Sequence, residues 1–108
     1  MNDLEGLMIY KQYVSLIYYT LDILKKYPKS ERFSLVQDIK LNTYSGIKNI
    51  IIANKEFNKS NRVKILYNVD NDFKMLKVLI RVSYKYKYIN KRNYSAWSKK
   101  ITNINNLL

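Results

Sequence analysis

The sequence predicts an all-α protein, an up-down-up-down antiparallel four-helix bundle, and three observations support this fold class. Apolar residues recur three and four residues apart through four long segments, which is the spacing of a buried helix face. The connections between these segments are short, so sequential helices should be antiparallel neighbours. Two glycines and one proline in 108 residues leave few turns, which argues against an all-β fold. At this length we expect one domain over residues 1–108.

The first helix is predicted from about Asp3 to Lys26. Its acidic start and its two terminal lysines both suit the helix dipole. Pro28 should end it, because the residue before a proline is pushed out of the α region. The predicted core face steps by three and four residues through Leu7, Tyr10, Val14, Ile17, Leu21 and Leu24.

The second helix is predicted to begin after Ser30, a good N-cap residue, and to fade between Asn54 and Asn58. Gly46 is unfavourable inside a helix by about 1 kcal/mol relative to alanine, so we expect a neighbouring helix to approach closely there. The small residues Thr43, Gly46 and Ala53 suit either packing within the chain or an oligomer interface. The predicted core face consists of Val36, Ile39, Thr43, Gly46, Ile50 and Ala53, widened by Tyr44, Ile47 and Ile51.

The third helix should follow a second cap candidate, Ser60, and end near Lys87, and the fourth should begin near Asn90. The predicted core face of the third helix is Leu66, Val69, Phe73, Leu76, Ile80 and Ser83. That of the fourth is Tyr94, Trp97, Ile101, Ile104 and Leu108. The predicted loops are therefore short, at residues 27–30, 56–60 and 88–90.

The charge of the chain predicts an acidic partner. Lys and Arg number 20 against 8 Asp and Glu, which gives a net charge of +12. Such a field attracts nucleic acid, an anionic membrane or an acidic protein surface, and the binding weakens as salt rises. On the third helix, four cations spaced three and four residues apart project from one side. We call Lys74, Lys77, Arg81 and Lys85 the basic stripe. Because like charges at this spacing repel, the stripe favours an anionic partner over the alternative of a solvated lysine face.

A second group of cations surrounds the expected connection between the first two helices. We call Lys25, Lys26, Lys29 and Arg32 the corner cluster. It is a second candidate binding surface, although two of its lysines would also simply complement a helix C-terminus. Tyrosines and lysines alternate from Tyr84 to Tyr88. This segment could stack on bases, but we favour its interpretation as the end of the third helix.

Catalysis is not expected. The chain has no His and no Cys, and it contains no glycine-rich phosphate loop or metal-ligand spacing. Asp70 and Asp72 are two residues apart, so on a helix they do not face each other. We expect local ion pairs instead, Asp70 with Lys74 and Asp72 with Lys77. The sequence therefore predicts no catalytic residue, cofactor or bound metal.

We also expect no membrane association. No apolar run approaches the roughly 20 residues that span a bilayer, and the acidic N-terminus lacks the basic region of a secretory signal. A cytoplasmic protein is the prediction. A membrane-surface bundle is a weaker alternative, based on Tyr13, Tyr18 and Tyr19 of the first helix, whose polar face carries few lysines.

Three motifs along the chain match the pattern of a known family. The first is the aromatic-Pro-Lys-Ser-x-Arg-Phe corner at residues 27–33, followed by Gln37 and Ile39. The others are residues 73–82, within the third helix, and residues 88–94, at the start of the fourth. All three resemble motifs of the accessory variability determinant (Avd) proteins, which accompany the reverse transcriptase of diversity-generating retroelements. The related four-helix proteins encoded in intervening sequences of 23S ribosomal RNA genes are the alternative family. The segment Ile51-Ile52-Ala53-Asn54 is closer to the Avd pattern.

The resemblance implies a homopentamer that binds the reverse transcriptase and its template RNA, with DNA as an open alternative. Lys77 and Arg81 match basic positions of the family's third helix, and Arg32 matches its basic corner position. Val36 and Asn90 depart from the family pattern, where Gly and Ser are usual. The predicted function is non-catalytic: a basic scaffold that positions template and enzyme. The alternative is the intervening-sequence protein, with a nucleic-acid-related role.

Overall fold

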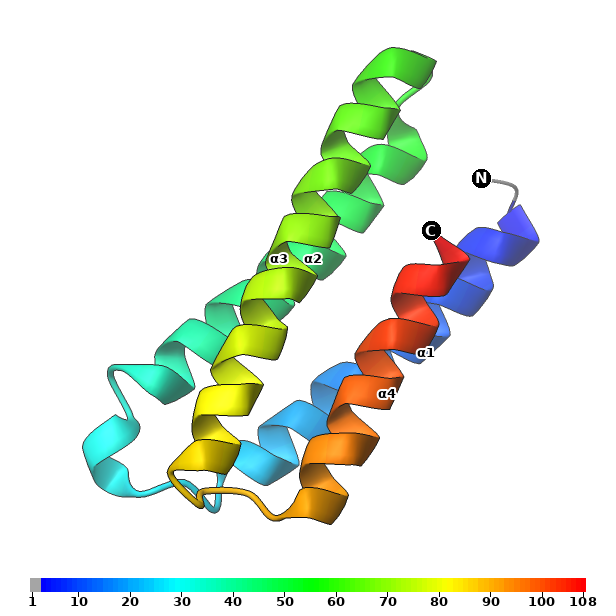
Figure 1. Cartoon of the computed structure of the whole chain (residues 1–108). Helices are drawn as coiled ribbons and strands as arrows, with labels where there is room; N and C mark the ends of the chain where they lie inside the picture. Colours follow the sequence, from blue (N-terminus) through cyan, green and yellow to red (C-terminus); the bar gives the residue numbers. More distant parts are fainter. Residues whose placement is uncertain (1–2) are drawn as a thin grey trace.

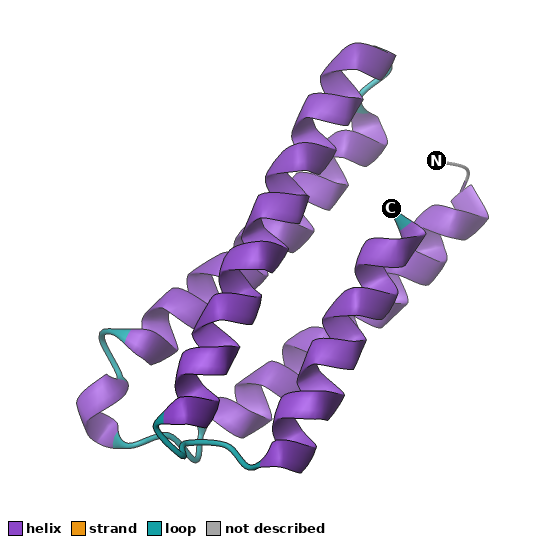
Figure 2. Ribbon diagram, in the orientation of Figure 1, coloured by secondary structure: helices purple, strands orange, loops and turns teal. Residues whose placement is uncertain are grey.

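The computed structural model describes the backbone of residues 3–108 and the side chains of residues 6–108. Four helices follow one another: α1 (Asp3–Leu24), α2 (Leu35–Lys55), α3 (Lys59–Lys85) and α4 (Lys91–Leu107), with a short 3₁₀ helix, η1 (Lys29–Glu31), before α2. Each helix packs against its neighbours in sequence, and α1 also packs against α4 (Figure 1). No strand occurs in residues 3–108, and loops are confined to the ends of the bundle (Figure 2). The predicted all-α, up-down-up-down bundle is confirmed.

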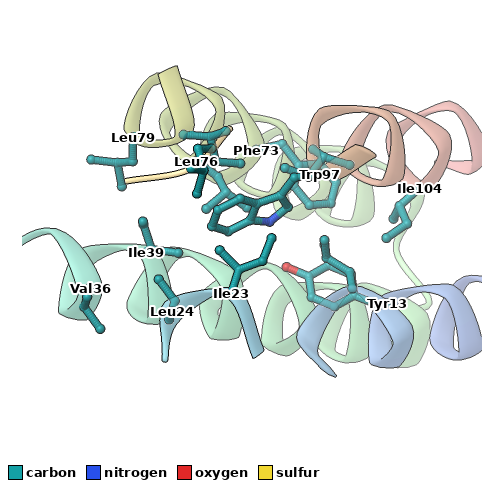
Figure 3. Close-up of a cluster of buried hydrophobic side chains, with 14 of the residues drawn as sticks. Tyr13, Ile23, Leu24, Val36, Ile39, Phe73, Leu76, Leu79, Trp97 and Ile104 are labelled. Carbon is teal, nitrogen blue, oxygen red and sulfur yellow. The ribbon is translucent and has the colours of Figure 1, made fainter. Parts of the chain in front are cut away.

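The predicted core faces of α2, α3 and α4 are largely correct. All six core residues predicted for α2 are buried, as are Trp97, Ile101 and Ile104 of α4. On α3 the predicted residues Val69, Phe73, Leu76, Ile80 and Ser83 are buried, while Leu66 is half-buried. Figure 3 shows Trp97 and Phe73 pointing across the core toward the side chains of α1. The widening row of α2 is correct at Ile47, which is half-buried against the core, and wrong at Tyr44 and Ile51, which are exposed.

The small residues of α2 pack within the chain. Thr43 and Ala53 are buried, and a Cβ added at Gly46 would overlap the hydroxyl oxygen of Tyr13 from α1. The close approach predicted at Gly46 is therefore confirmed, and the approaching helix is α1. Of the two interpretations of this small-residue row, packing within the chain is the one that the structure supports.

The predicted core face of α1 is wrong by one residue. Of the six predicted positions only Leu24 is buried, and Leu7 and Tyr10 are half exposed, at 50% and 52%. The core residues are instead Ile9, Tyr13, Leu16, Thr20 and Ile23. Each precedes a predicted position by one residue, which rotates the buried face by about 100°. Because α1 is apolar on several sides, the apolar pattern alone does not identify its buried face. The contacts of its polar core residues, Tyr13 and Thr20, determine which face is buried.

Two of those core members satisfy their polar groups inside the bundle. The Tyr13 hydroxyl donates a hydrogen bond of 2.6 Å to the backbone carbonyl of Thr43. The indole N–H of Trp97 donates to the Thr20 hydroxyl oxygen at 3.0 Å. Burying a hydroxyl without a partner is costly, but these bonds remove most of that cost. The polar positions 13 and 20 can therefore face the core.

The start of α2 is four residues later than predicted. Pro28 is extended, and the backbone N–H of Glu31 donates to its carbonyl at 3.0 Å, which places Ser30 inside η1 rather than at an α-helix N-cap. The N-cap of α2 is Ser34, whose hydroxyl donates to the Glu31 carboxylate at 2.8 Å instead of capping the helix. The α1–α2 connection, residues 25–34, is therefore a longer, structured corner.

The other helix ends differ from prediction by one or two residues. Asn58, not Ser60, caps α3, because its side-chain oxygen accepts from the Asn61 N–H at 3.1 Å. The end of α3 is at Lys85, where Lys87 adopts a left-handed φ of 65° and Tyr88 N–H donates to the Ser83 carbonyl. The start of α4 next to Asn90 is as predicted, and the Asn90 side chain caps the helix by accepting from the Asn93 N–H at 2.8 Å.

Candidate nucleic-acid interface

The basic stripe lies on the exposed surface of α3, and its four cations differ in their contacts. Lys74 pairs with Asp70 at 2.9 Å, as predicted. The hydrogen bond from Lys74 is the main reason why the pKa of Asp70 is lowered below its ordinary value. Lys77 donates to the Thr102 hydroxyl of α4 at 2.9 Å. Arg81 and Lys85 form no ion pair with any side chain of residues 6–108, so their charges are available to a partner.

The predicted pair of Asp72 with Lys77 is wrong. Asp72 faces α2, where its carboxylate accepts from the Ser45 hydroxyl at 2.8 Å and from the Asn49 amide at 3.3 Å. Lys77 lies on the α4 side of the same helix. The Asp72 carboxylate therefore points away from Lys77 and Arg81, and the acidic side chain that acts on Lys77 is Asp70, which also pairs with Lys74.

A groove between α3 and α4 connects the middle of the basic stripe to the neighbouring helix. It has a volume of about 320 Å³, with Lys77, Val78 and Arg81 on one wall and Tyr94 and Ser98 on the other. Hydroxyl groups and an aromatic ring therefore stand beside two cations. This arrangement can bind phosphate oxygens or an acidic protein segment.

The corner cluster is only partly assembled. Lys25, Lys29 and Arg32 line a pocket of about 450 Å³ between the end of α1 and the start of α2, and Lys26 does not. A fourth cation, Lys40, joins them from α2. The sequence analysis did not include Lys40 in this cluster. Its spacing could have indicated it, because Lys40 lies one helical turn after the core residue Val36.

The structure does not bring the two basic surfaces together. The pocket at the corner opens between α1 and α2, whereas the groove of the basic stripe lies between α3 and α4. In a bundle whose helices neighbour one another in sequence, these are opposite faces. A single bound molecule would have to reach around the bundle to contact both. They are therefore separate candidate sites.

The tyrosines at the end of α3 pack mainly on other tyrosines. Tyr84 meets Tyr94 edge-on, with ring centroids 4.9 Å apart, and Tyr86 stacks on Tyr88 at 6.2 Å. Tyr88 also contacts Tyr27, and burial together with the Glu31 carboxylate raises its pKa. These contacts, with the end of α3 at Lys85, support the favoured interpretation of this segment as a helix end.

Two further features bear on function. The part of the chain that the structure describes holds no group of three acidic, histidine or cysteine side chains placed to bind a metal ion. Of the helices in residues 3–108, none is both long and apolar enough to cross a bilayer. Of the three tyrosines behind the membrane-surface alternative, Tyr13 is buried and Tyr19 half-buried. Only Tyr18 would be free to meet a membrane.

Comparisons with known proteins place this geometry in context. A family model described as bAvd-like matches residues 7–108, nearly the whole chain. No curated protein matches. Among solved structures, the chain is similar to a protein of unknown function from the S23 ribosomal protein family of Bacteroides thetaiotaomicron. The TM-score is 0.84 and the identity 14%, over 95% of this chain and 93% of the other. At that identity the likeness shows the fold alone.

Proposed function

Because the chain belongs to the bAvd-like family, an accessory protein family, we propose that it is a non-catalytic scaffold that binds a reverse transcriptase and its template RNA. The observation that carries the proposal is the basic stripe. Arg81 and Lys85 are exposed without an ion pair among residues 6–108, and Lys77 is held beside them by α4. The enzyme supplies the chemistry, and this protein positions template and enzyme.

Electrostatics accounts for the affinity in this proposal. A chain with a net charge of +12 neutralises backbone phosphates and releases their counterions, which needs no reading of base sequence. The groove between α3 and α4 adds the hydroxyls of Ser98 and Tyr94, which can hydrogen-bond to phosphate oxygens or to an acidic segment of the enzyme. The Lys77–Thr102 bond already restricts the Lys77 side chain, so Lys77 loses less conformational entropy when a partner binds.

Self-association is part of the proposal, with the pentamer of the family as the expected state. Large apolar side chains remain exposed on adjacent helices, Tyr10 and Tyr18 on α1 and Leu41 and Ile51 on α2. Exposed side chains of this kind would be covered where two subunits meet. In a ring of subunits, each basic stripe would be repeated around the assembly, which multiplies the phosphate contacts available to one RNA.

A pull-down with paired variants tests this function. Lys77→Glu/Arg81→Glu should leave the bundle folded, because both side chains are exposed, and should abolish retention of the reverse transcriptase and template RNA. The matched control is Lys59→Glu/Lys64→Glu, which changes the charge equally at the other end of α3. Equal retention by the stripe variant and the control would contradict the proposal. Circular dichroism of both variants separates a binding defect from a folding defect.

A further inference from the structure

The corner pocket, the space lined by residues of α1, η1 and α2, combines an apolar floor with a rim of cations. Its volume of about 450 Å³ lies within the range of small-molecule sites, roughly 300–1,000 Å³. The floor consists of Leu21, Leu24, Tyr27, Pro28 and Val36, and the rim of Lys25, Lys29, Arg32 and Lys40. Of the acidic side chains in residues 6–108, none lines it.

Local backbone structure brings these cations together. Pro28 is the N-cap of η1, and the N–H groups of Glu31 and Arg32 donate to carbonyls three residues earlier. Residues three apart in such a turn lie on the same side, so Lys29 and Arg32 point in a common direction. On α2, Lys40 follows Val36 by one turn and shares its face. The pocket is thus a consequence of the corner that replaces the predicted start of α2.

The rim is short of negative charge. Lys25 makes one long, exposed contact of 3.5 Å with Asp22. Lys29, Arg32 and Lys40 form no ion pair with a side chain of residues 6–108. Cations gathered around one pocket repel each other, and a ligand with several negative charges relieves that repulsion. The arginine fork and flanking lysines match the oxygens of a phosphate group, and the floor offers contact to a flat, largely apolar group.

A phosphate chain joined to a flat ring is a nucleotide, and we propose that the corner pocket binds one, with the phosphates on the rim and the base against the floor. The choice of a nucleotide over another phosphorylated molecule rests on the proposed RNA-related function. The site itself is separate from the basic stripe, on the opposite face. The nucleotide could be free in solution or the triphosphorylated end of an RNA strand, which carry the same chemistry.

Calorimetry on the purified chain alone tests the proposal with uridine triphosphate at low salt. We expect saturable binding of one nucleotide per chain, and binding at least about tenfold weaker in Arg32→Ala/Lys40→Ala. The control Lys59→Ala/Lys64→Ala removes the same charge away from the pocket and should change the affinity by no more than about twofold. Both pocket residues are exposed, so the variant should fold, which circular dichroism checks.

Further ligands separate the contribution of the phosphates from that of the base, and they distinguish a free nucleotide from the end of an RNA strand. Uridine and inorganic triphosphate should each bind about tenfold more weakly than the nucleotide, because each lacks half of the contacts. Tighter binding of a 5′-triphosphorylated RNA oligonucleotide than of the same oligonucleotide with a 5′-hydroxyl, with the difference lost in Arg32→Ala/Lys40→Ala, assigns the strand end, and equal binding of the two oligonucleotides assigns the free nucleotide. Either result supports the pocket.

Three results would overturn the proposal. These are the absence of saturable nucleotide binding, equal weakening in the pocket variant and its control, and inorganic triphosphate binding as tightly as the nucleotide. Retention on phosphatidylserine vesicles that depends on Arg32 and Lys40, without nucleotide binding, would assign the pocket to membranes instead. Because no reverse transcriptase is present, failure here leaves the pull-down of the basic stripe untouched, and failure of the pull-down leaves the pocket untouched.

Discussion

The hydroxyl group of Tyr13 occupies the space beside Gly46 that a Cβ atom would fill. Tyr13 comes from α1, donates a hydrogen bond of 2.6 Å to the Thr43 carbonyl of α2, and stacks on Phe73 of α3 with ring centroids 5.9 Å apart. One buried side chain therefore links three helices. A glycine in the middle of α2 is unfavourable on its own, and this contact is the physical reason that it is there.

Substitution of Gly46 should destabilise the bundle. Alanine favours a helix by about 1 kcal/mol over glycine, but its Cβ would displace Tyr13, and overpacking of this kind costs about 1–3 kcal/mol or more. We expect Gly46→Ala to lower the free energy of unfolding, measured by urea denaturation. In a Tyr13→Phe background, which removes the overlapping oxygen, the loss should be smaller. Equal losses in both backgrounds would mean that the hydroxyl does not limit the approach.

The two buried tyrosine hydroxyls should respond oppositely to removal. Tyr13→Phe deletes the bond to Thr43 and should cost about 1 kcal/mol. The Tyr27 hydroxyl lies near Ser83 but forms no hydrogen bond of good geometry within residues 3–108. Tyr27→Phe should therefore leave stability unchanged or raise it. Urea midpoints of the two variants compare them directly, and a larger loss at position 27 would contradict the assignment.

Stability should fall in alkali. Burial raises the pKa of Tyr27 from 10.0 to about 12, and burial with the Asp72 charge raises that of Tyr13 further. Below pH 10 both hydroxyls are neutral in the folded chain, and their full contribution to the free energy of unfolding is present. Between pH 10 and 12 the unfolded chain loses these protons first, so the free energy of unfolding decreases as pH rises. Urea midpoints across this range measure the slope, which should be shallower in Tyr27→Phe.

Loss of the Thr20–Trp97 hydrogen bond should destabilise the bundle more than loss of an exposed hydroxyl on the same helix. Thr20→Val keeps the shape but leaves the buried indole N–H without its acceptor, which costs about 1–3 kcal/mol. Ser15→Ala, on the exposed side of the same helix, should change stability by no more than about 0.5 kcal/mol. Thermal unfolding followed by tryptophan fluorescence distinguishes them. Similar values for the two variants would show that the indole finds another partner.

Prediction from sequence succeeded where one face of a helix is clearly polar. On α2, α3 and α4 the apolar residues form a single dominant stripe, so the period identifies the buried face. On α1 two stripes one residue apart compete, and the choice depends on Tyr13 and Thr20, whose hydroxyl partners belong to other helices. Nothing within α1 itself indicates those partners.

For the candidate sites too, features that belong to one helix were predictable from the sequence. The basic stripe is a property of one helix, so the spacing along α3 was enough to place its four cations on one side of that helix. Contacts between two elements could not be predicted in this way. Examples are the Lys77–Thr102 bond, the contact of Asp72 with α2 and the position of Lys40 at the corner pocket. The predicted start of α2 after Ser30 is wrong because the i→i+3 hydrogen bonds after Pro28 form the short helix η1 there instead.

The most direct test of the central claim, that the basic stripe binds template RNA, is the salt dependence of RNA affinity. Titrations of wild type, Lys77→Ala/Arg81→Ala and the control Lys59→Ala/Lys64→Ala would be repeated over a range of salt concentrations. We predict a shallower slope of log affinity against log salt for the stripe variant, by about 0.7 for each phosphate of a single strand that the variant fails to neutralise. The control should keep the wild-type slope, and a stripe variant with that same slope and affinity would contradict the claim.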